Sequence, residues 1–442
     1  MEFTGNMAKF SSILLLLICF SFSSFQTTTT TEALCHDTDK AALLDFKKNI
    51  IEDPSHVLRT WNQSTDCCTY WDGIACDDSN GRVVDVNLPN VFRFRCGGWF
   101  RTSPCNMSMV GTISPSLGNL EFLRNLDLRY LEHLHGSIPS ELGKLSHLTS
   151  LLLNGNKLEG PIPASFQHLH KLEELNLANN HLSGRIQSSV FEHMTVLSEI
   201  YLYGNQLSGE IPSSVGKLVS LKTLHIQDNN FSGGIPSTIG SLKNLTSLDL
   251  GGNQISGSIP SSFSGLISLS HCRMSFNKLT GSIPSSIGKM LTLNKFIVTD
   301  NMLTGNLPDS IGNLTNLWSL QVSNNRLTGK IPSTLCNLNL ETLDLSSNLF
   351  TGELPEWIGN TTSLSFLDLS DNRLHSVIPS AVLNLPKLLF LNVSHNRLTG
   401  KIPPRVFLKT KFPRYHAVFP ATSFEGNPGL CDSPLPPCHS TA

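Results

Sequence analysis

The chain has 442 residues, a formal net charge of -2 and 15% charged residues. It carries no basic stripe that could follow a nucleic-acid backbone, so we do not expect nucleic acid as a partner. After the amino terminus no apolar run reaches the roughly 18 residues that a membrane-spanning helix needs, so no later transmembrane segment is predicted.

The amino terminus predicts a secretory signal peptide. Lys9 precedes an apolar run over residues 13–20, and small or polar residues follow to about Ala33. This run is short for a membrane span, although an uncleaved anchor is the alternative. We expect residues 1–30, approximately, to be removed and the mature chain to be soluble.

The next segment, residues 35–82, predicts a separate amino-terminal unit. Residues 37–50 have the pattern of an amphipathic helix, with Asp37 or Thr38 as its N-cap. Tryptophan and cysteine residues are concentrated in the stretch from Trp61 to Cys76 that follows the helix.

Residues 83–122 predict a first half-repeat that is interrupted by an insertion from Val91 to Ser108. The insertion contains Cys96 and Cys105, three arginines and four aromatic residues. We expect a disulfide-pinned loop that covers the edge of the amino-terminal unit. A second contact patch for a partner is the alternative.

Residues 123–411 contain the phrase L-x-x-L-x-L-x-x-N-x-L-x-G-x-I-P about every 24 residues, which gives about twelve repeats. Leu245–Pro260 is one copy. The repeated asparagines are Asn156, Asn180, Asn205, Asn229, Asn253, Asn277, Asn301, Asn325, Asn348, Asn372 and Asn396. A fixed period of this length predicts a solenoid, in which each repeat buries its apolar face by stacking on its neighbours.

Each position of the repeat has a physical role. The last two leucines alternate with polar residues, as on a parallel strand with one buried face. The asparagine amide can bond backbone groups that would otherwise be buried and unpaired, at about 1–3 kcal/mol each. The pattern has local departures: Gln187 replaces proline, Ser376 replaces glycine, and one extra residue occurs around Leu131–Glu132.

The G-x-I-P half of the repeat, as in Gly136–Pro139, Gly209–Pro212 and Gly400–Pro403, resembles the plant-type leucine-rich repeat. Similar chains are polygalacturonase-inhibiting proteins, secreted DNA-damage-repair/toleration-like proteins and receptor-like protein ectodomains. The resemblance covers roughly residues 35–438. It implies an α/β superhelical solenoid with a parallel β-sheet on the concave face, short second strands, and 3-10 or helical turns on the convex side.

The same resemblance implies disulfide-capped ends. Residues 35–82 resemble the family's amino-terminal cap, and Ser423–Cys438, within 412–442, resembles its carboxy-terminal cap, so both ends of one ectodomain are expected. The predicted disulfide cysteines are Cys35, Cys67, Cys68, Cys76, Cys96, Cys105, Cys431 and Cys438.

Family similarity suggests the pairs Cys35–Cys67 and Cys68–Cys76, and proximity suggests Cys96–Cys105 and Cys431–Cys438, although sequence alone does not fix connectivity. The two remaining cysteines of the repeats, Cys272 and Cys336, are predicted to be free and packed. A zinc site at Cys67, Cys68 and Cys76 lacks C-x-x-C spacing, so no metal is predicted.

Seven N-x-[ST] sequons support secretion: Asn62, Asn106, Asn230, Asn244, Asn313, Asn360 and Asn392. Asn392 lies on a concave strand, where a glycan would obstruct the face. The chain also has fifteen histidines, and at the mildly acidic pH of plant cell walls, about 5.5, exposed histidines would be protonated.

The outward positions of the central strands predict a ligand site. The candidates are Tyr201, Tyr203, His225, Gln227, Asp228, His271, Arg273, Phe276, Lys295, Trp318 and Gln321. Exposed aromatic residues beside arginine are typical of protein-binding hot spots, whereas ordinary surface variation is the alternative. Phe366, Leu389 and Phe390 extend an apolar edge towards the carboxy terminus.

Catalysis is not predicted, because no G-x-S-x-G, H-E-x-x-H or glycine-rich phosphate motif occurs. Concave carboxylates such as Asp228 and Asp249 could resemble a glycosidase pair. On an open, wet face we expect no desolvation that would raise the pKa of such carboxyls. A carbohydrate-active enzyme is therefore only a distant alternative, and no catalytic residue or cofactor is expected.

We predict a secreted, non-enzymatic module of the extracellular space or cell wall that binds a protein or peptide on its concave face. The first interpretation is plant defence, as an inhibitor of a pathogen's cell-wall-degrading enzyme. The absence of a predicted transmembrane segment after the amino terminus favours this interpretation. The alternative is a receptor-like ectodomain or co-receptor that signals through a membrane receptor kinase. Cell-wall polysaccharide is a further candidate partner.

Overall fold

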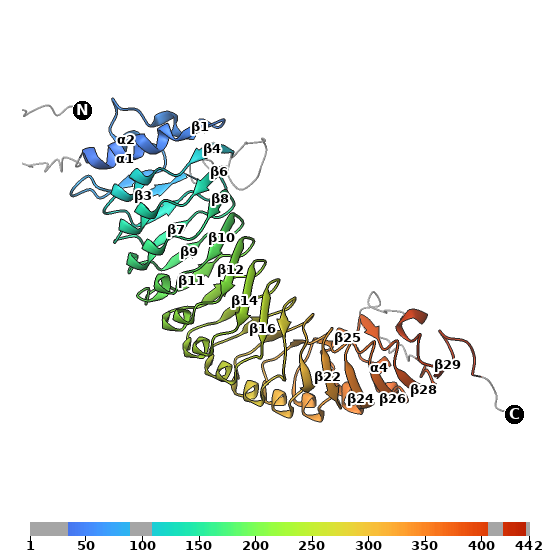
Figure 1. Ribbon diagram of the computed structural model, residues 1–442. Coiled ribbons are helices and arrows are strands. Elements are labelled where there is room, and N and C mark those ends of the chain that lie inside the picture. The colour runs from blue at the N-terminus through green and yellow to red at the C-terminus, as the bar shows by residue number, and fades with distance from the viewer. Residues whose placement is uncertain (1–33, 89–107, 405–418, 439–442) are drawn as a thin grey trace, which may run out of the picture.

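The computed structural model describes residues 34–88, 108–404 and 419–438 as a curved stack of repeats (Figure 1). The predicted signal peptide lies outside the described residues, as do the Cys96–Cys105 pair and Asn106. Within the described residues, no helix combines the length and apolarity needed to cross a membrane.

The amino-terminal unit contains helices α1 (Asp37–Lys48) and α2 (Cys67–Tyr70) and the single 3-10 turn η1 (Val57–Thr60). The predicted N-cap of α1 is wrong, because His36 is the last residue with extended backbone and Asp37 is already helical. Acidic residues in the first turn suit the positive end of the helix dipole. In α2 the cap is a side chain, since the Asp66 carboxylate accepts hydrogen bonds from two backbone N–H groups.

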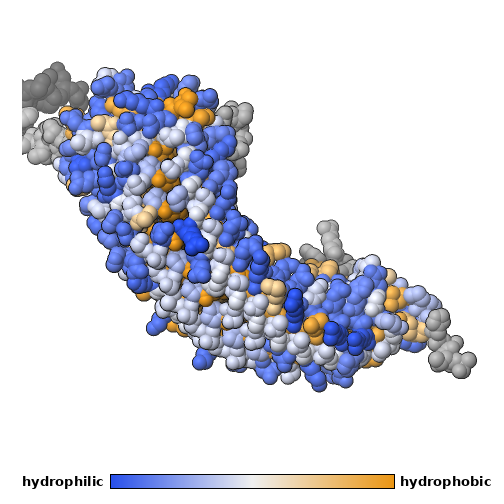
Figure 2. Space-filling view, in the orientation of Figure 1, coloured by the Kyte–Doolittle hydropathy of each residue, from blue (hydrophilic) through white to orange (hydrophobic). Residues whose placement is uncertain are grey.

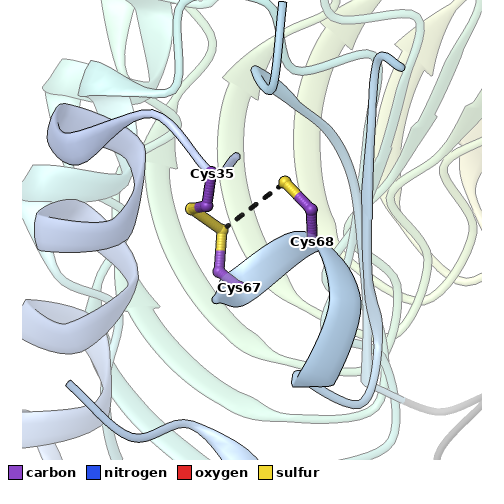
Figure 3. A group of neighbouring side chains, drawn as sticks. All are labelled: Cys35, Cys67 and Cys68. Carbon is purple, nitrogen blue, oxygen red and sulfur yellow. Dashed lines mark hydrogen bonds between the residues drawn. A yellow bond between two sulfur atoms is a disulfide. The ribbon is translucent and has the colours of Figure 1, made fainter. Parts of the chain in front are cut away.

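Aromatic stacking and two disulfides close this unit. Trp61 stacks on Trp71 with ring centres 5.4 Å apart. Disulfides join Cys35 to Cys67 and Cys68 to Cys76, as the family resemblance implied. Figure 3 shows the Cys35–Cys67 bond beside the Cys68 sulfur, which lies 4.0 Å from the Cys67 sulfur. These sulfur atoms are in disulfides and are therefore not available as thiolate ligands for zinc.

The concave sheet has fourteen strands in chain order, and every pair is parallel except β2–β3. Each three-residue strand from β5 onward places one leucine or similar residue inward and two side chains outward, as the alternation predicted. The strands are β2 (Ile74–Cys76), β3 (Val83–Asn87), β5 (Asn125–Asp127), β7 (Ser150–Leu152), β9 (Glu174–Asn176), β11 (Glu199–Tyr201), β13 (Thr223–His225), β15 (Ser247–Asp249), β17 (His271–Arg273), β19 (Lys295–Ile297), β21 (Ser319–Gln321), β23 (Thr342–Asp344), β25 (Phe366–Asp368) and β27 (Phe390–Asn392).

The predicted second strands form two further sheets, one of nine strands and one of six. The nine are β1 (Ile50–Glu52), which is antiparallel to its neighbour, and β4 (Met109–Thr112), β6 (Glu132–Ser137), β8 (Lys157–Gly160), β10 (His181–Arg185), β12 (Gln206–Glu210), β14 (Asn230–Gly234), β16 (Gln254–Gly257) and β18 (Lys278–Leu279). The six are β20 (Thr304–Asn306), β22 (Arg326–Gly329), β24 (Leu349–Glu353), β26 (Arg373–Ser376), β28 (Arg397–Lys401) and β29 (Gly429–Cys431).

Short 3-10 turns complete each repeat on the convex side. Proline or its substitute precedes most of them with φ near that of the pyrrolidine ring, which explains why Gln187, at φ -66°, takes the place of proline without distortion. The turns are η2 (Pro115–Asn119), η3 (Ser140–Lys144), η4 (Ala164–His168), η5 (Ser188–Phe191), η6 (Ser213–Lys217), η7 (Ser237–Ser241), η8 (Ser261–Gly265), η9 (Ser285–Lys289), η10 (Asp309–Asn313), η11 (Ser333–Asn337), η12 (Glu356–Asn360) and the helical α4 (Ser380–Leu383); η14 (Ala421–Ser423) lies in the carboxy-terminal cap.

The asparagines form the predicted ladder of side-chain to backbone hydrogen bonds. Asn253 Nδ2 lies 3.1 Å from the carbonyl oxygens of Ile226 and Leu250, and its Oδ1 accepts from the N–H of Phe231 at 3.0 Å. Each rung therefore joins neighbouring repeats. One further rung, not predicted from the repeat pattern, comes from Asn427 of the carboxy-terminal cap, which donates to the Val393 carbonyl and accepts from the N–H of Leu398 in the last repeat.

The first full repeat breaks the ladder. Leu131, which is fully buried, takes the place of the asparagine, and Glu132 after it has a positive φ angle that the residue after the rung does not have in the other repeats. Asn156 in the next repeat consequently has a buried Oδ1 without a partner among the described residues. Later in the stack, Ser376 adopts φ 91° where other repeats have glycine.

The remaining cysteines agree only in part with prediction. Cys431 and Cys438 form a disulfide, as proximity suggested. Cys272 is free and buried, and burial raises the pKa of its thiol. Cys336 is free but exposed, so the prediction that it is packed is wrong. It follows the inward Leu335 on the turn η11 and therefore points away from the core.

Candidate ligand-binding face

Parallel register brings the outward side chains into two rows along the concave sheet. One row runs through Glu199, Thr223, Ser247, His271, Lys295 and Ser319, and the other through Tyr201, His225, Asp249, Arg273, Ile297 and Gln321. Neighbours in a row belong to adjacent strands, so they lie about 4.8 Å apart along the stack. Six of the eleven predicted ligand residues therefore lie on five nearly consecutive strands.

Tyr201 and His225 make direct contact. Their ring centres are 5.5 Å apart in an edge-on arrangement, the Tyr201 hydroxyl donates to Glu199 Oε2 at 2.7 Å, and His225 Nε2 lies 2.8 Å from Ser247 Oγ. Burial, followed by the hydrogen bond to Glu199, raises the pKa of Tyr201 to about 12. These contacts hold both rings in fixed positions on the face.

The two histidines of the predicted site gain charge less readily than a free histidine. Burial lowers the pKa of His225, and burial together with the Lys295 charge lowers the pKa of His271. Both imidazoles therefore stay neutral to lower pH than free histidine does. His225 is partly buried, whereas His271 is exposed but lies beside the Lys295 charge.

A second cluster lies on β19 and β21. The Lys295 ammonium is 4.6 Å from the centre of the Trp318 ring, a cation–π arrangement. Gln321 donates to Ser319 Oγ at 3.0 Å. Arg273 lies on β17, between the two clusters. Burial raises the pKa of the neighbouring Asp249, and the charge of Arg273 lowers it by a smaller amount.

Four predicted residues lie beside the strands rather than on them. Tyr203, Gln227, Asp228 and Phe276 belong to the turns that follow β11, β13 and β17. Phe276 is 55% exposed and, like Asp228, has a positive φ. The Gln227 oxygen is buried without a partner among the described residues. These residues form one rim of the face.

Sequence analysis missed a run of acidic side chains at the amino-terminal end of the face. Burial raises the pKa of Asp85 and Glu174, and raises the pKa of Asp127 to about 6. Burial also raises the pKa of Asp249. The expectation that an open face would leave concave carboxyls unperturbed is therefore wrong, because neighbouring strands lie close enough to exclude much of the water.

The carboxy-terminal end of the face carries a stacked aromatic pair. Phe366 and Phe390 lie with ring centres 4.4 Å apart and planes inclined by 5°. Beside them, Asn392 accepts from the N–H of Ser394 at 3.2 Å and donates towards Asp368 Oδ2 at 3.5 Å. Asn392 thus has a structural role, and its glycosylation remains a prediction.

The surface is mostly polar, with a narrow apolar band in its amino-terminal half (Figure 2). The repeat sheets, the asparagine ladder and this face define a leucine-rich-repeat protein of the plant type. The leucine rich repeat N-terminal domain family matches residues 36–77, and leucine rich repeat families match 146–207, 219–279, 316–338 and 338–398. The chain belongs to the plant leucine-rich-repeat proteins.

Three curated relatives are similar to parts of the chain. Leucine-rich repeat protein FLOR 1 of Arabidopsis thaliana is 33% identical over 36% of this chain, and DNA damage-repair/toleration protein DRT100 of the same plant is 34% identical over 28%. Receptor-like protein EIX1 of Solanum lycopersicum is 36% identical over 30%. The matches span 39%, 32% and 12% of those relatives.

Two solved structures are similar in fold and sequence. The complex PEPR1-AtPEP1 has a TM-score of 0.71 and 32% identity, covering 83% of this chain and 53% of that chain. The plant peptide hormone receptor RGFR1, in complex with RGF2, has a TM-score of 0.60 and 35% identity, covering 66% of this chain and 51% of that chain.

Proposed function

We propose that this protein is an extracellular, receptor-like recognition module that binds a peptide or an extended protein segment along its concave face. The observation that carries the proposal is the pair of ordered aromatic clusters, Tyr201 with His225 and Trp318 with Lys295, on either side of Arg273. Aromatic residues and arginine are the residue types most enriched in binding hot spots.

The spacing of the clusters favours an elongated ligand. Tyr201 lies on β11 and Trp318 immediately precedes β21, five strands further along, so the clusters are roughly 24 Å apart. An extended chain of about seven residues has this length. A small metabolite cannot reach both clusters, whereas a peptide or a protein edge can.

The relatives favour signalling over enzyme inhibition. They include a receptor-like protein and a peptide hormone receptor in complex with its ligand. We therefore prefer the receptor-like interpretation, with a peptide ligand and a membrane receptor kinase as partners, to an inhibitor of a pathogen enzyme. The module acts by binding and carries out no chemistry of its own.

The test begins with a partner isolated by immobilised protein from extracellular fluid at pH about 5.5 and identified by mass spectrometry. Surface-plasmon measurements then compare Trp318→Ala and Tyr201→Ala with the unmodified protein. We expect each change to weaken binding by about 1–3 kcal/mol without lowering the melting temperature.

Tyr70→Ala is the matched control, because Tyr70 is an exposed aromatic residue of α2 in the amino-terminal unit and not on the strands β11–β21 that carry the clusters. It should bind like the unmodified protein. The proposal fails if the partner binds Trp318→Ala and Tyr201→Ala as tightly as it binds the control. Isolation of a secreted hydrolase whose activity the protein blocks would restore the inhibitor interpretation.

A further inference from the structure

The amino-terminal end of the concave face has a chemistry that the aromatic clusters do not explain. We call it the acidic end: the surface formed by Asp85 of β3, Asp127 of β5, Asn154 after β7, Glu174 of β9 and Glu199 of β11. Arg129 Nε lies 3.1 Å from Asp127 Oδ2 and provides a counter-charge. A second guanidinium, that of the exposed Arg124, immediately precedes β5, and the four carboxylates outnumber the two cations and leave the surface negative.

Neighbouring side chains satisfy these carboxylates only in part. Asn125 donates to Asp85 at 2.5 Å, and Ser150 donates weakly to Glu174 at 3.4 Å. Each bond uses one oxygen of a carboxylate that can accept several hydrogen bonds. Acceptor capacity therefore remains for a donor that arrives from solvent.

An independent observation is a buried acceptor without a donor. Asn154 follows the inward Leu153 as Arg129 follows Leu128 and Tyr203 follows Leu202 in other repeats, so its place in the repeat is beside the concave strands, on the side of the face that these residues occupy. Asn154 is only 3% exposed, and its Oδ1 has no hydrogen-bond partner in the described part of the chain. The Tyr130 N–H to Asn154 carbonyl bond, 2.8 Å long, places it next to the repeat that carries Asp127.

We propose that the acidic end binds a lysine or arginine side chain of the ligand. The inference rests on the proposed function and adds a direction to it: the basic part of the ligand lies over β3–β11. Its acidic or aromatic part then lies over Arg273 and Lys295, so that charges are complementary along the face.

The chemistry of a cationic group matches what the acidic end lacks. Ammonium and guanidinium groups are donors only, whereas ionised carboxylates and the amide oxygen are acceptors. Burial destabilises the charged forms of Asp85, Asp127 and Glu174 and raises their pKa, and a bound cation would reverse this effect. The carboxylates of the acidic end therefore have more negative charge than the neighbouring arginine side chains neutralise, and a cationic group of the ligand would provide the missing positive charge.

The test uses the full mature chain and a fluorescein-labelled tetralysine peptide with blocked ends, with binding followed by fluorescence anisotropy. Salt is kept at about 150 mM, where charges more than roughly 8 Å apart are screened. The variant Asp85→Asn/Glu174→Gln keeps the shapes and removes two charges. We expect its Kd for the probe to rise about tenfold or more.

Glu159→Gln/Glu210→Gln is the matched control, since it removes two charges from exposed positions on β8 and β12. Its Kd should stay within about twofold of the unmodified protein's value, because distant charges are screened. Asn154→Leu removes the unpartnered acceptor and should raise the Kd about threefold while leaving the melting temperature unchanged or higher.

A probe that does not bind the unmodified protein, or equal losses in the charge variant and its control, would overturn the acidic end as a cation site. Those outcomes leave the proposed function untouched, because Asp85 and Glu174 contact neither aromatic cluster. Conversely, the probe results can be as expected while a natural partner binds Trp318→Ala and Tyr201→Ala as tightly as the unmodified protein. The acidic end would then be a cation site, and the proposed function would be wrong.

Discussion

The interior of the stack and its concave surface are built from the same short strands but follow different rules. Along β11 and the turn after it, Ile200 and Leu202 are buried, while Tyr201 and Tyr203 face outward. Inward positions carry the same residue types in nearly every repeat, and outward positions change from repeat to repeat. The difference shows that the repeat determines the fold through its interior and leaves the surface free to specify a ligand.

The strongest way to disrupt the interior is to open its amino-terminal end. Cys35→Ser/Cys67→Ser removes a bridge that spans 32 residues and should cost about 4 kcal/mol of unfolding free energy. Cys431→Ser/Cys438→Ser removes a bridge that spans 7 residues and should cost about 2 kcal/mol. Urea denaturation followed by circular dichroism gives both values. The exposed Cys336→Ser is the control and should change stability by less than about 0.5 kcal/mol.

A single rung of the ladder should have the next largest effect. Asn253→Ala removes a buried amide that bonds the backbone of two neighbouring repeats, so we expect a loss of about 1–3 kcal/mol in urea denaturation. Gln254→Ala, one residue further along and exposed, should stay within about 0.5 kcal/mol. Equal losses in the two variants would mean that the inward and outward assignment is mistaken.

The fold was predictable because a solenoid repeats one local solution. The 24-residue period specifies the strand, the asparagine rung and the convex turn wherever the phrase occurs, and even Gln187 and Ser376 keep the backbone of the residues they replace. The N-cap at His36 was not predictable from residue preferences, because Asp37 and Thr38 are the residue types that favour this position. The helix begins one residue earlier than expected, so both lie in its first turn.

The candidate site was predictable in position but not in electrostatics. The alternation identified Tyr201 and Trp318 as outward residues. It did not indicate that Asp127, also outward, has a side chain only 1% exposed. How much water reaches an outward carboxylate depends on the side chains of the adjacent strands and on local curvature, which a pattern within one repeat does not contain.

The buried carboxylate offers a smaller test of this surface. Because the pKa of Asp127 is raised to about 6 in the folded protein, its stabilising contribution is present below pH about 4 and is lost as pH rises through 6. Asp127→Asn should therefore gain about 1–2 kcal/mol at pH 7, less than the full shift implies because the titrations of neighbouring carboxyls are coupled.

Urea denaturation at pH about 4 and about 7 checks this expectation, since the gain should disappear at the lower pH. Glu210→Gln, exposed on β12, controls for the change in net charge. A gain of the same size at both pH values would point to an effect of shape rather than of proton binding.

The smallest expected effect comes from the rung at the break in the ladder. Asn156 Nδ2 donates to the carbonyls of Leu128 and Leu153, both at 2.9 Å, but its Oδ1 has no partner among the described residues. The N–H of His133, at the position of the usual donor, bonds the Leu131 carbonyl instead. Asn156→Ala loses fewer bonds than Asn253→Ala and also removes an unsatisfied acceptor. It should therefore cost about 0.5–1 kcal/mol less in urea denaturation. If the two substitutions cost the same, the hydrogen bond that Asn253 Oδ1 accepts from the preceding repeat adds nothing measurable, and the Nδ2 bonds account for the rung.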